Sequence, residues 1–152
     1  MSSTDVAPTL ANPGASPAQP RKLFLNIPVT DLQRSIDFFE ALGFTFNAQF
    51  TDATAAAMLI GEDAYCMLLT EERFKGFSRR PLGDRATETN ALFALGVQSR
   101  DDVDAMVKAA VAAGGSYAVD PQDHGFMCGW SFRDFDHHHW EVFWMDSAAV
   151  NA

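Results

Sequence analysis

The sequence has few cysteines, few basic residues and no long apolar run. Its two cysteines, Cys66 and Cys128, are too few for a disulfide framework in a chain of 152 residues, and we therefore expect a cytoplasmic location. No uninterrupted apolar stretch approaches the ~20 residues that span a bilayer, which argues against a membrane-spanning helix. With 11 basic against 20 acidic residues the net charge is -9, which disfavours nucleic acid and anionic membranes as partners.

The first 20 residues lack both the basic start and the apolar centre of a secretory signal. They hold four of the seven prolines, among small and polar residues. Such a segment has little to bury against the entropy that is lost on ordering it. We therefore expect residues 1–20 to be a disordered tail, residues 21–146 to be the folded domain, and residues 147–152 to be a second tail.

What the chain does contain, from residue 21 onward, is a regular pattern of strands around one helix. Thr30 and Asp31 offer N-cap oxygens for a helix whose apolar residues recur every three or four positions, and Gly43 ends it. Strands are predicted at 22–29, 44–50, 55–60 and 64–70, with a hairpin turn at 61–63. Residues 21–70 therefore form a first βαβββ module.

The same pattern returns in residues 90–146. Ser99, followed three residues later by Asp102, has the spacing of a capping box, and Gly114 ends the second helix. Strands are predicted at 90–97, 116–120, 126–132 and 138–145. Because Val29 corresponds to Val97 and Gly43 to Gly114, the chain is a tandem repeat of one module.

A linker loop at 71–89 joins the two modules, and it is both long and basic. It carries five of the 11 basic residues: Arg73, Lys75, Arg79, Arg80 and Arg85. Loops of this length are commonly lids or binding loops as well as linkers. Both interpretations stay open: a plain linker, or a lid whose Arg79 and Arg80 meet an anionic group of a substrate.

Two segments resemble the vicinal-oxygen-chelate superfamily, which includes glyoxalase I, bleomycin-resistance proteins and extradiol dioxygenases. Residues 25–44 begin Leu-Asn-Ile-Pro-Val-Thr-Asp, and residues 132–142 read Phe-Arg-Asp-Phe-Asp-His-His-His-Trp-Glu-Val. The resemblance, closest to bacterial glyoxalase-like proteins, implies an α+β fold of tandem βαβββ modules. The sheets would form half-barrels around a cavity, with the helices on the outer face. It also implies a small-molecule ligand or substrate and a homodimer.

The resemblance further implies a metal site, with one ligand from the first and one from the last strand of each module. The corresponding positions hold Phe24, Leu68, Leu92 and Glu141. Three of these side chains are apolar, whereas metal sites of the family use several nitrogen and oxygen donors. We therefore expect no cofactor; Glu141 and His139 would be metal ligands only if further donors came from elsewhere.

The last predicted strand also yields candidate catalytic residues. Successive side chains of a strand alternate between its faces, so Trp140, Val142 and Trp144 share one face and His139 and Glu141 share the other. The first set suits a face covered by a helix, which leaves the second set on the cavity side. Glu141 and His139 are therefore the candidate acid–base pair. The alternative is that Glu141 only hydrogen-bonds across the cavity and holds the modules together.

Residues 137–139 are three consecutive histidines. Neighbouring residues of a strand cannot all face one site, so they are not a three-histidine zinc motif. His137 occupies a turn position where the family usually has glycine, and histidine enters the left-handed conformation more readily than most residues.

Aromatic residues are abundant, with 13 Phe, three Trp and two Tyr. The residues expected to line the cavity and bind a ligand are Phe24, Asn26, Thr70, Trp130 and Phe143. Apolar walls with a few polar groups are typical of small-molecule sites. In a chain of charge -9, such a cavity favours a cationic, aromatic ligand.

Three functions remain open from the sequence. One is a lyase or isomerase of the lactoylglutathione-lyase type, with Glu141 as general base on a proton next to a carbonyl. Another is a non-catalytic protein that sequesters its ligand, in the manner of antibiotic-resistance proteins. The third, an extradiol dioxygenase, requires an iron site of two histidines and one carboxylate, which Phe24 and Leu92 disfavour.

Overall fold

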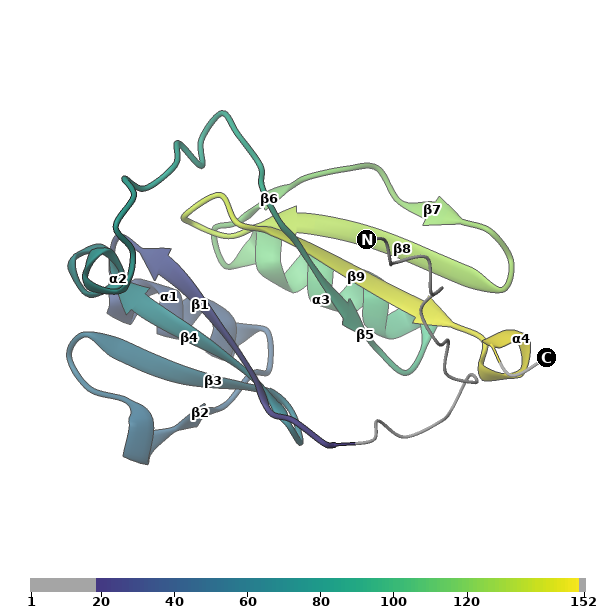
Figure 1. Cartoon of the computed structure of the whole chain (residues 1–152). Coiled ribbons are helices and arrows are strands. Elements are labelled where there is room, and N and C mark those ends of the chain that lie inside the picture. Colours follow the sequence, from purple (N-terminus) through teal and green to yellow (C-terminus); the bar gives the residue numbers. More distant parts are fainter. Residues whose placement is uncertain (1–18, 151–152) are drawn as a thin grey trace, which may run out of the picture.

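The computed structural model describes residues 19–150 and contains two sheets, each with a long helix on one face (Figure 1). The elements are β1 (Leu23–Val29), α1 (Leu32–Ala41), β2 (Phe46–Asn47), the 3-10 turn η1 (Ala48–Phe50), β3 (Ala55–Gly61), β4 (Ala64–Thr70), α2 (Glu71–Phe77), β5 (Leu92–Gly96), α3 (Arg100–Ala112), β6 (Ser116–Tyr117), β7 (Gln122–Asp123), β8 (Met127–Arg133), β9 (His139–Met145) and α4 (Ser147–Val150). Sheet A has the order β1-β4-β3-β2, and sheet B has the order β5-β9-β8-β6, with β7 paired to β8.

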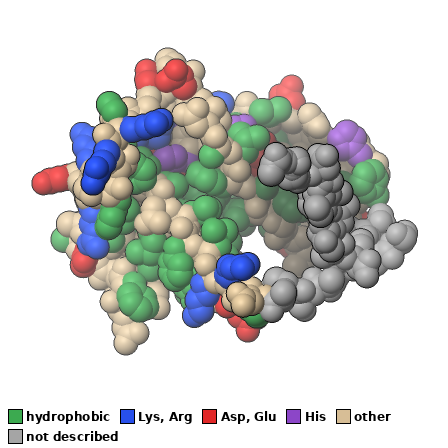
Figure 2. Space-filling view, in the orientation of Figure 1, with side chains coloured by type: hydrophobic (Ala, Val, Ile, Leu, Met, Phe, Trp, Pro, Cys, Tyr) green, Lys and Arg blue, Asp and Glu red, His purple; other side chains and the backbone are tan. Residues whose placement is uncertain are grey.

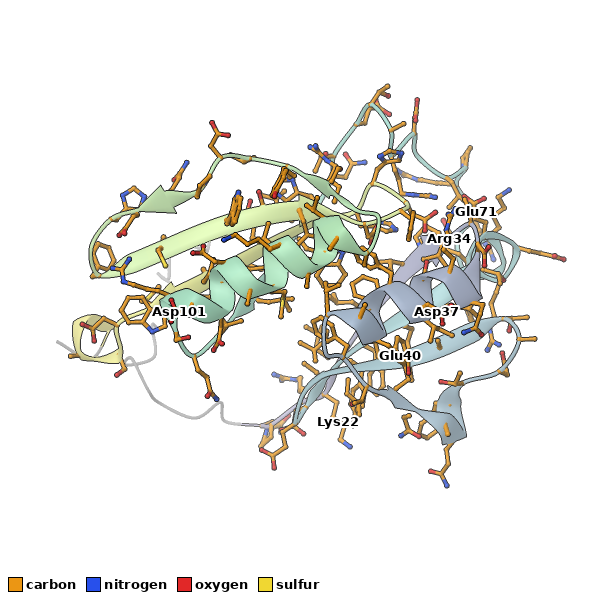
Figure 3. The ribbon with its side chains drawn as sticks, turned by 180° about the vertical axis from the view of Figure 1, so that it is seen from behind. Lys22, Arg34, Asp37, Glu40, Glu71 and Asp101 are labelled. Atoms are coloured by element: carbon orange, nitrogen blue, oxygen red, sulfur yellow. The ribbon has the colours of Figure 1, made fainter. Side chains whose placement is uncertain are left out.

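In Figure 1 the two sheets lie side by side, with α1 and α3 behind them. The free faces of both sheets open toward the viewer. From behind, α1 and α3 cover the sheets, and the exposed Asp37, Glu40 and Asp101 lie on this outer surface (Figure 3). The predicted α+β fold of tandem modules, with open half-barrel sheets and outer helices, is therefore confirmed.

The two long helices begin and end where the sequence predicts. The Asp31 carboxylate accepts a hydrogen bond from the Arg34 N–H at 3.1 Å, and the Ser99 hydroxyl accepts one from the Asp102 N–H at 3.1 Å. Each oxygen satisfies a backbone donor that has no partner within its helix. Gly43 follows α1 with φ +98° and Gly114 follows α3 with φ +113°, a conformation that glycine adopts without strain.

The predicted linker at 71–89 is not a loop throughout, because α2 occupies its first seven residues. The Thr70 hydroxyl caps this helix by accepting a hydrogen bond from the Arg73 N–H at 3.3 Å, and Glu71 and Glu72 in the first turn favour the helix dipole. The strand predicted at 44–50 is reduced to β2 and then turns into η1.

At the chain ends, residues 1–18 and 151–152 lie outside the described residues, and with them most of the first predicted tail and the last two residues of the second. The start of the second predicted tail forms α4. Within the part of the chain that the structure describes, no helix is long and apolar enough to cross a membrane.

One hydrophobic core serves both modules. Phe38 and Phe39 of α1 pack against Phe132 of β8 and Trp140 of β9, with the Phe39 and Trp140 ring centroids 5.3 Å apart. All four side chains are buried. Burial of large aromatic side chains contributes strongly to stability, so the two modules are expected to fold as one unit.

The turn between β8 and β9 fastens module two to the start of α1. Asp136 is buried and accepts hydrogen bonds from the N–H and the hydroxyl of Thr30, at 2.9 and 2.8 Å. The Nε2–H of His138 donates to the Pro28 carbonyl at 2.7 Å. Arg85 from the linker donates to the Asp136 carbonyl at 3.0 Å and to Glu71 at 3.1 Å. Both modules and the linker therefore meet at this turn.

Candidate functional site

Strand β9 places its side chains alternately on the core and on the free face of sheet B. Trp140 and Val142 are fully buried in the core. Glu141 pairs in register with Ala94, and Phe143 pairs with Gly96, on the opposite face. The structure therefore has the alternation that the sequence predicts, with Glu141 and Phe143 on the free face.

Glu141 is hydrogen-bonded to His139, two residues earlier on the same face. The distance between His139 Nε2 and Glu141 Oε1 is 2.8 Å, and the side chains are 6% and 34% exposed, respectively. With an ionised carboxylate, Nε2–H is the donor, because a carboxylate only accepts. The buried imidazole therefore orients a carboxyl group that is still open to solvent.

Glu141 lies in a hollow of about 410 Å³ on the free face of sheet B. Its lining residues are Ala94, Val119, Asp120, Gln122, Met127, Gly129, Trp130, Ser131, Glu141, Phe143 and Met145. They include two carboxylates, Asp120 and Glu141, and no basic residue. Phe143 forms part of the wall of this hollow, and Gly96 leaves room for its ring. A Cβ atom at Gly96 would lie only 3.3 Å from that ring. The hollow is thus apolar and acidic.

A second cavity, of about 280 Å³, lies between the modules beneath the linker. Ile27 and Pro28 of β1, Phe74 of α2 and Phe93 of β5 line it together with residues 81–85, 88–91 and 137–139. His139 therefore borders this cavity, while its partner Glu141 borders the hollow of sheet B. The hydrogen bond between them joins the walls of the two spaces.

Phe24 and Asn26 lie on the free face of sheet A, apart from Glu141. The Phe24 ring is 51% exposed and stacks on Tyr65, with ring centroids 4.7 Å apart. The side-chain amide of Asn26 donates to the Phe24 carbonyl at 3.2 Å. Neither residue lines the hollow of sheet B or the cavity beneath the linker. The structure therefore does not bring these two candidates together with Glu141 and Phe143.

Two of the predicted ligand-binding residues, Thr70 and Trp130, lie on the core side of their strands. Thr70 has the strand parity of the buried Leu68, and its hydroxyl is used to cap α2. Trp130 borders the hollow, but it pairs in register with the buried Val142 and packs against the core. Its ring stacks on Tyr117, with centroids 5.2 Å apart. On each strand, the adjacent residues and not Thr70 or Trp130 have the parity of the free face.

The strand register also corrects one of the expected metal-ligand positions. Phe24 pairs with Tyr65 in module one, and Leu92 pairs with His139 in module two. Glu141 lies two residues after His139. Its counterpart in module one is therefore Met67, two residues after Tyr65, and not the buried Leu68. The four positions therefore hold Phe24, Met67, Leu92 and Glu141. A carboxylate, a thioether and two hydrocarbon side chains do not form the nitrogen and oxygen donor set of the family's metal sites.

His139 adds one nitrogen donor beside Glu141, and these two donors are fewer than the family's metal sites use. Among residues 19–150, no group of three or more His, Cys, Asp or Glu side chains is placed to hold a metal ion. The residues at this site do not fit the family's metal centre.

The candidate residues from the sequence did not include Asp120 or Met127, which both line the hollow. Asp120 lies in an irregular segment between β6 and β7, where no periodicity signals its direction. The segment is held by the buried Ser131, whose hydroxyl accepts a hydrogen bond from the Val119 N–H at 2.9 Å. Met145, which the alternation of β9 predicts to share the face of Glu141, lines the hollow as well.

Comparison with known proteins identifies the fold family. The model of the Glyoxalase/Bleomycin resistance protein/Dioxygenase superfamily matches residues 23–142, and the chain belongs to this superfamily. A search of curated proteins gives no significant match.

Three solved structures illustrate the similarity. A hypothetical protein from S. aureus is 27% identical, with a TM-score of 0.72 over 83% of this chain and 95% of that chain. A glyoxalase-related enzyme from Fulvimarina pelagi is 17% identical, with a TM-score of 0.70 over 84% and 88%. The fosfomycin resistance protein FosX from Listeria monocytogenes, complexed with Mn(II) and sulfate ion, is 18% identical, with a TM-score of 0.60 over 90% and 96%. The last two show similarity of fold alone.

Proposed function

We propose that this protein binds a small cationic molecule with an apolar or aromatic body in the hollow of sheet B, without a metal ion. The observation that carries this proposal is the composition of the hollow: Asp120 and Glu141 supply negative charge, and no lining residue is basic. Carboxylates favour a cation, and the walls of Met127, Phe143 and Met145 favour an apolar body.

The charge of the hollow also disfavours one ligand suggested by the relatives. Fosfomycin, to which the FosX proteins give resistance, is a phosphonate and therefore an anion. Two carboxylates on the hollow repel an anion, and none of the lining residues is a cation that would attract it. The proposal thus separates this chain from those relatives by ligand charge.

A second candidate function is a metal-independent lyase or isomerase, and the bond between His139 and Glu141 favours it. The Glu141 carboxylate would accept a proton from a carbon next to a carbonyl, while the carbon–hydrogen electron pair moves toward the carbonyl oxygen to give an enolate. In an α-hydroxycarbonyl substrate the hydroxyl proton would then move to the enolate oxygen, and the oxygen that lost it would form the new carbonyl as the removed proton returns to the former carbonyl carbon, which completes an isomerisation. His139 would hold the carboxylate in place throughout.

We further propose that the protein is a homodimer. β1 and β5 are edge strands of their sheets, and they expose Leu23, Phe24 and Leu92. Exposed apolar side chains on unpaired edges favour association with another chain. A second copy would cover these residues and deepen the open free faces.

A thermal-shift and calorimetry screen tests the ligand proposal. Three groups of compounds are compared: cationic antibiotics, glutathione conjugates and catechols, and fosfomycin. A cationic ligand at 100 times its Kd is expected to stabilise the fold by about 2.7 kcal/mol, with the same result in EDTA. Stabilisation by anions alone, or only with added metal, would contradict the proposal.

The lyase candidate is tested separately by following the hemithioacetal of glutathione and methylglyoxal in EDTA. Turnover that disappears in Glu141→Gln would support it. Binding of a cation without turnover of a carbonyl compound would exclude the lyase candidate and support ligand binding as the function.

A further inference from the structure

The charge of this chain is divided unevenly along the sequence. Residues 73–80 read Arg-Phe-Lys-Gly-Phe-Ser-Arg-Arg, with four cations and no acid. The remainder of the chain has seven basic against 20 acidic residues and therefore carries a net charge of -13. An anion that approaches the molecule is repelled by most of its charge and attracted by this short segment.

Three of these cations are free to meet a partner. Lys75, Arg79 and Arg80 are exposed, and within residues 19–150 none of them forms an ion pair. Arg73 differs, because it pairs with Asp52 at 3.5 Å. Figure 2 shows Lys and Arg side chains gathered over α2 and the start of the linker.

Phe77 lies among these cations at the end of α2. It is 72% exposed, the largest exposed fraction among the large hydrophobic side chains of the described residues. Phe74, three residues earlier on α2, instead lines the cavity beneath the linker. We refer to Lys75, Phe77, Arg79 and Arg80 as the basic patch. It presents an apolar ring and three positive charges at the end of α2 and in the residues that follow it.

The basic patch is separate from the small-molecule site. None of its four residues lines the hollow of sheet B or the cavity beneath the linker. The expectation that Arg79 and Arg80 meet an anionic group of a substrate therefore finds no support in either space. A partner of these residues must reach them from outside, on the surface of the molecule.

We infer that the basic patch binds an acidic segment of a partner protein that carries an apolar side chain. Carboxylates of the segment would pair with Lys75, Arg79 and Arg80, and its apolar side chain would cover Phe77. A duplex or a membrane is an extended anionic surface, and it would also approach the acidic remainder of the chain. A short segment touches the patch alone, since charges beyond about 8 Å are screened at physiological salt.

The test is fluorescence anisotropy with a labelled peptide in which glutamates alternate with leucines. Binding is expected to weaken as salt rises from 50 to 200 mM, because salt screens the attraction between charges at the surface. The triple variant K75E/R79E/R80E is expected to weaken it at least about tenfold. Phe77→Ser is expected to weaken it about threefold, but to leave binding of a peptide with serine in place of leucine unchanged.

A matched control separates the patch from overall charge. R21E/K22E/K108E makes the same change in net charge at exposed positions outside the patch, and it is expected to alter binding less than about twofold. Equal loss in both triple variants would overturn the inference. Tighter binding of an oligo-dT of equal charge, or of vesicles with 30% phosphatidylserine, would also overturn it, by assigning the patch to nucleic acid or to lipid.

Discussion

Glu141 combines a fixed hydrogen bond with access to solvent. His139 holds one carboxylate oxygen at 2.8 Å, yet the Glu141 side chain remains 34% exposed within an acidic hollow. A purely structural carboxylate in a core is expected to be buried and saturated with donors. The combination at Glu141 instead suits a group that meets a ligand.

Glu141→Gln is expected to weaken binding of a cationic ligand at least about tenfold, and to change the free energy of unfolding by less than about 1 kcal/mol. The amide keeps the shape of the side chain but carries no charge. Calorimetry and urea unfolding measure the two effects. Glu40→Gln, on the outer face of α1, is the matched control (Figure 3). A loss of about 1–3 kcal/mol in stability with unchanged binding would assign Glu141 a structural role.

Asp134 provides a titrating group inside the core. Burial raises its pKa above the ordinary value of 3.8, more than the nearby His138 and the hydrogen bond from Trp140 lower it. The folded protein therefore holds this proton to higher pH than the unfolded chain does. Its contribution to stability is complete below the ordinary aspartate pKa and is lost as pH rises through the raised pKa.

The free energy of unfolding of the natural protein, relative to that of Asp134→Asn, is therefore expected to fall as pH rises from about 4 toward neutrality. Urea unfolding at several pH values measures it. The exposed Asp101→Asn is the control and is expected to show no such trend. A constant difference between the natural protein and Asp134→Asn would contradict the expectation.

At the scale of the elements, the junction of α3 with β6 packs closely against backbone atoms. Gly115 follows the end of α3, and a Cβ atom at this position would lie 2.6 Å from the Arg133 carbonyl oxygen and 3.0 Å from that of Ala110. Backbone atoms of a strand and a helix cannot move aside as the end of a flexible side chain can.

Gly115→Ala is accordingly expected to lower the free energy of unfolding by about 2–4 kcal/mol. Gly61→Ala, where a Cβ would meet no atom within 4 Å, is expected to change it by less than about 1 kcal/mol. Chemical denaturation of the two variants compares them. Similar losses in both would show that the close approach at Gly115 does not limit stability.

On the scale of the whole molecule, the donor set predicts the response to metals. Phe24, Met67 and Leu92 stand at three of the four positions implied by the family's metal site. Stoichiometric Zn, Ni, Mn or Fe is therefore expected to shift the melting temperature by less than about 1 °C, because only binding to the folded state stabilises it. A rise of several degrees that EDTA reverses would show that ligands come from elsewhere in the chain.

Assembly is predicted from the edge strands. β1 starts with a hydrogen bond from the Leu23 N–H to the Asp63 carbonyl at 2.8 Å, so its first residue is held within module one. A chain that begins at Arg21 is expected to form a dimer of the same stoichiometry, with an unchanged melting temperature. Light scattering and calorimetry compare it with the full chain. A monomer, or a clear loss of stability, would count against the prediction.

The sequence by itself determined the two modules, their helix boundaries and the side of β9 that carries Glu141. These depend on local rules: Asp31 and Ser99 cap helices through their own neighbours, Gly43 and Gly114 permit positive φ, and residues two apart on a strand share a face. His137 follows the same rule, with φ +66° in the turn before β9. Such features need no information from distant parts of the chain.

Only the tertiary structure decided which candidates meet. Phe24 and Asn26 are on the free face of sheet A and Glu141 is on that of sheet B, while Thr70 and Trp130 turned out to have the opposite parity. Asp120 lies on the hollow because Ser131 of β8 holds the irregular segment at Val119, 12 residues earlier in the sequence. Strand register and the packing of irregular segments arise from contacts between distant residues, and a local pattern cannot encode those distances.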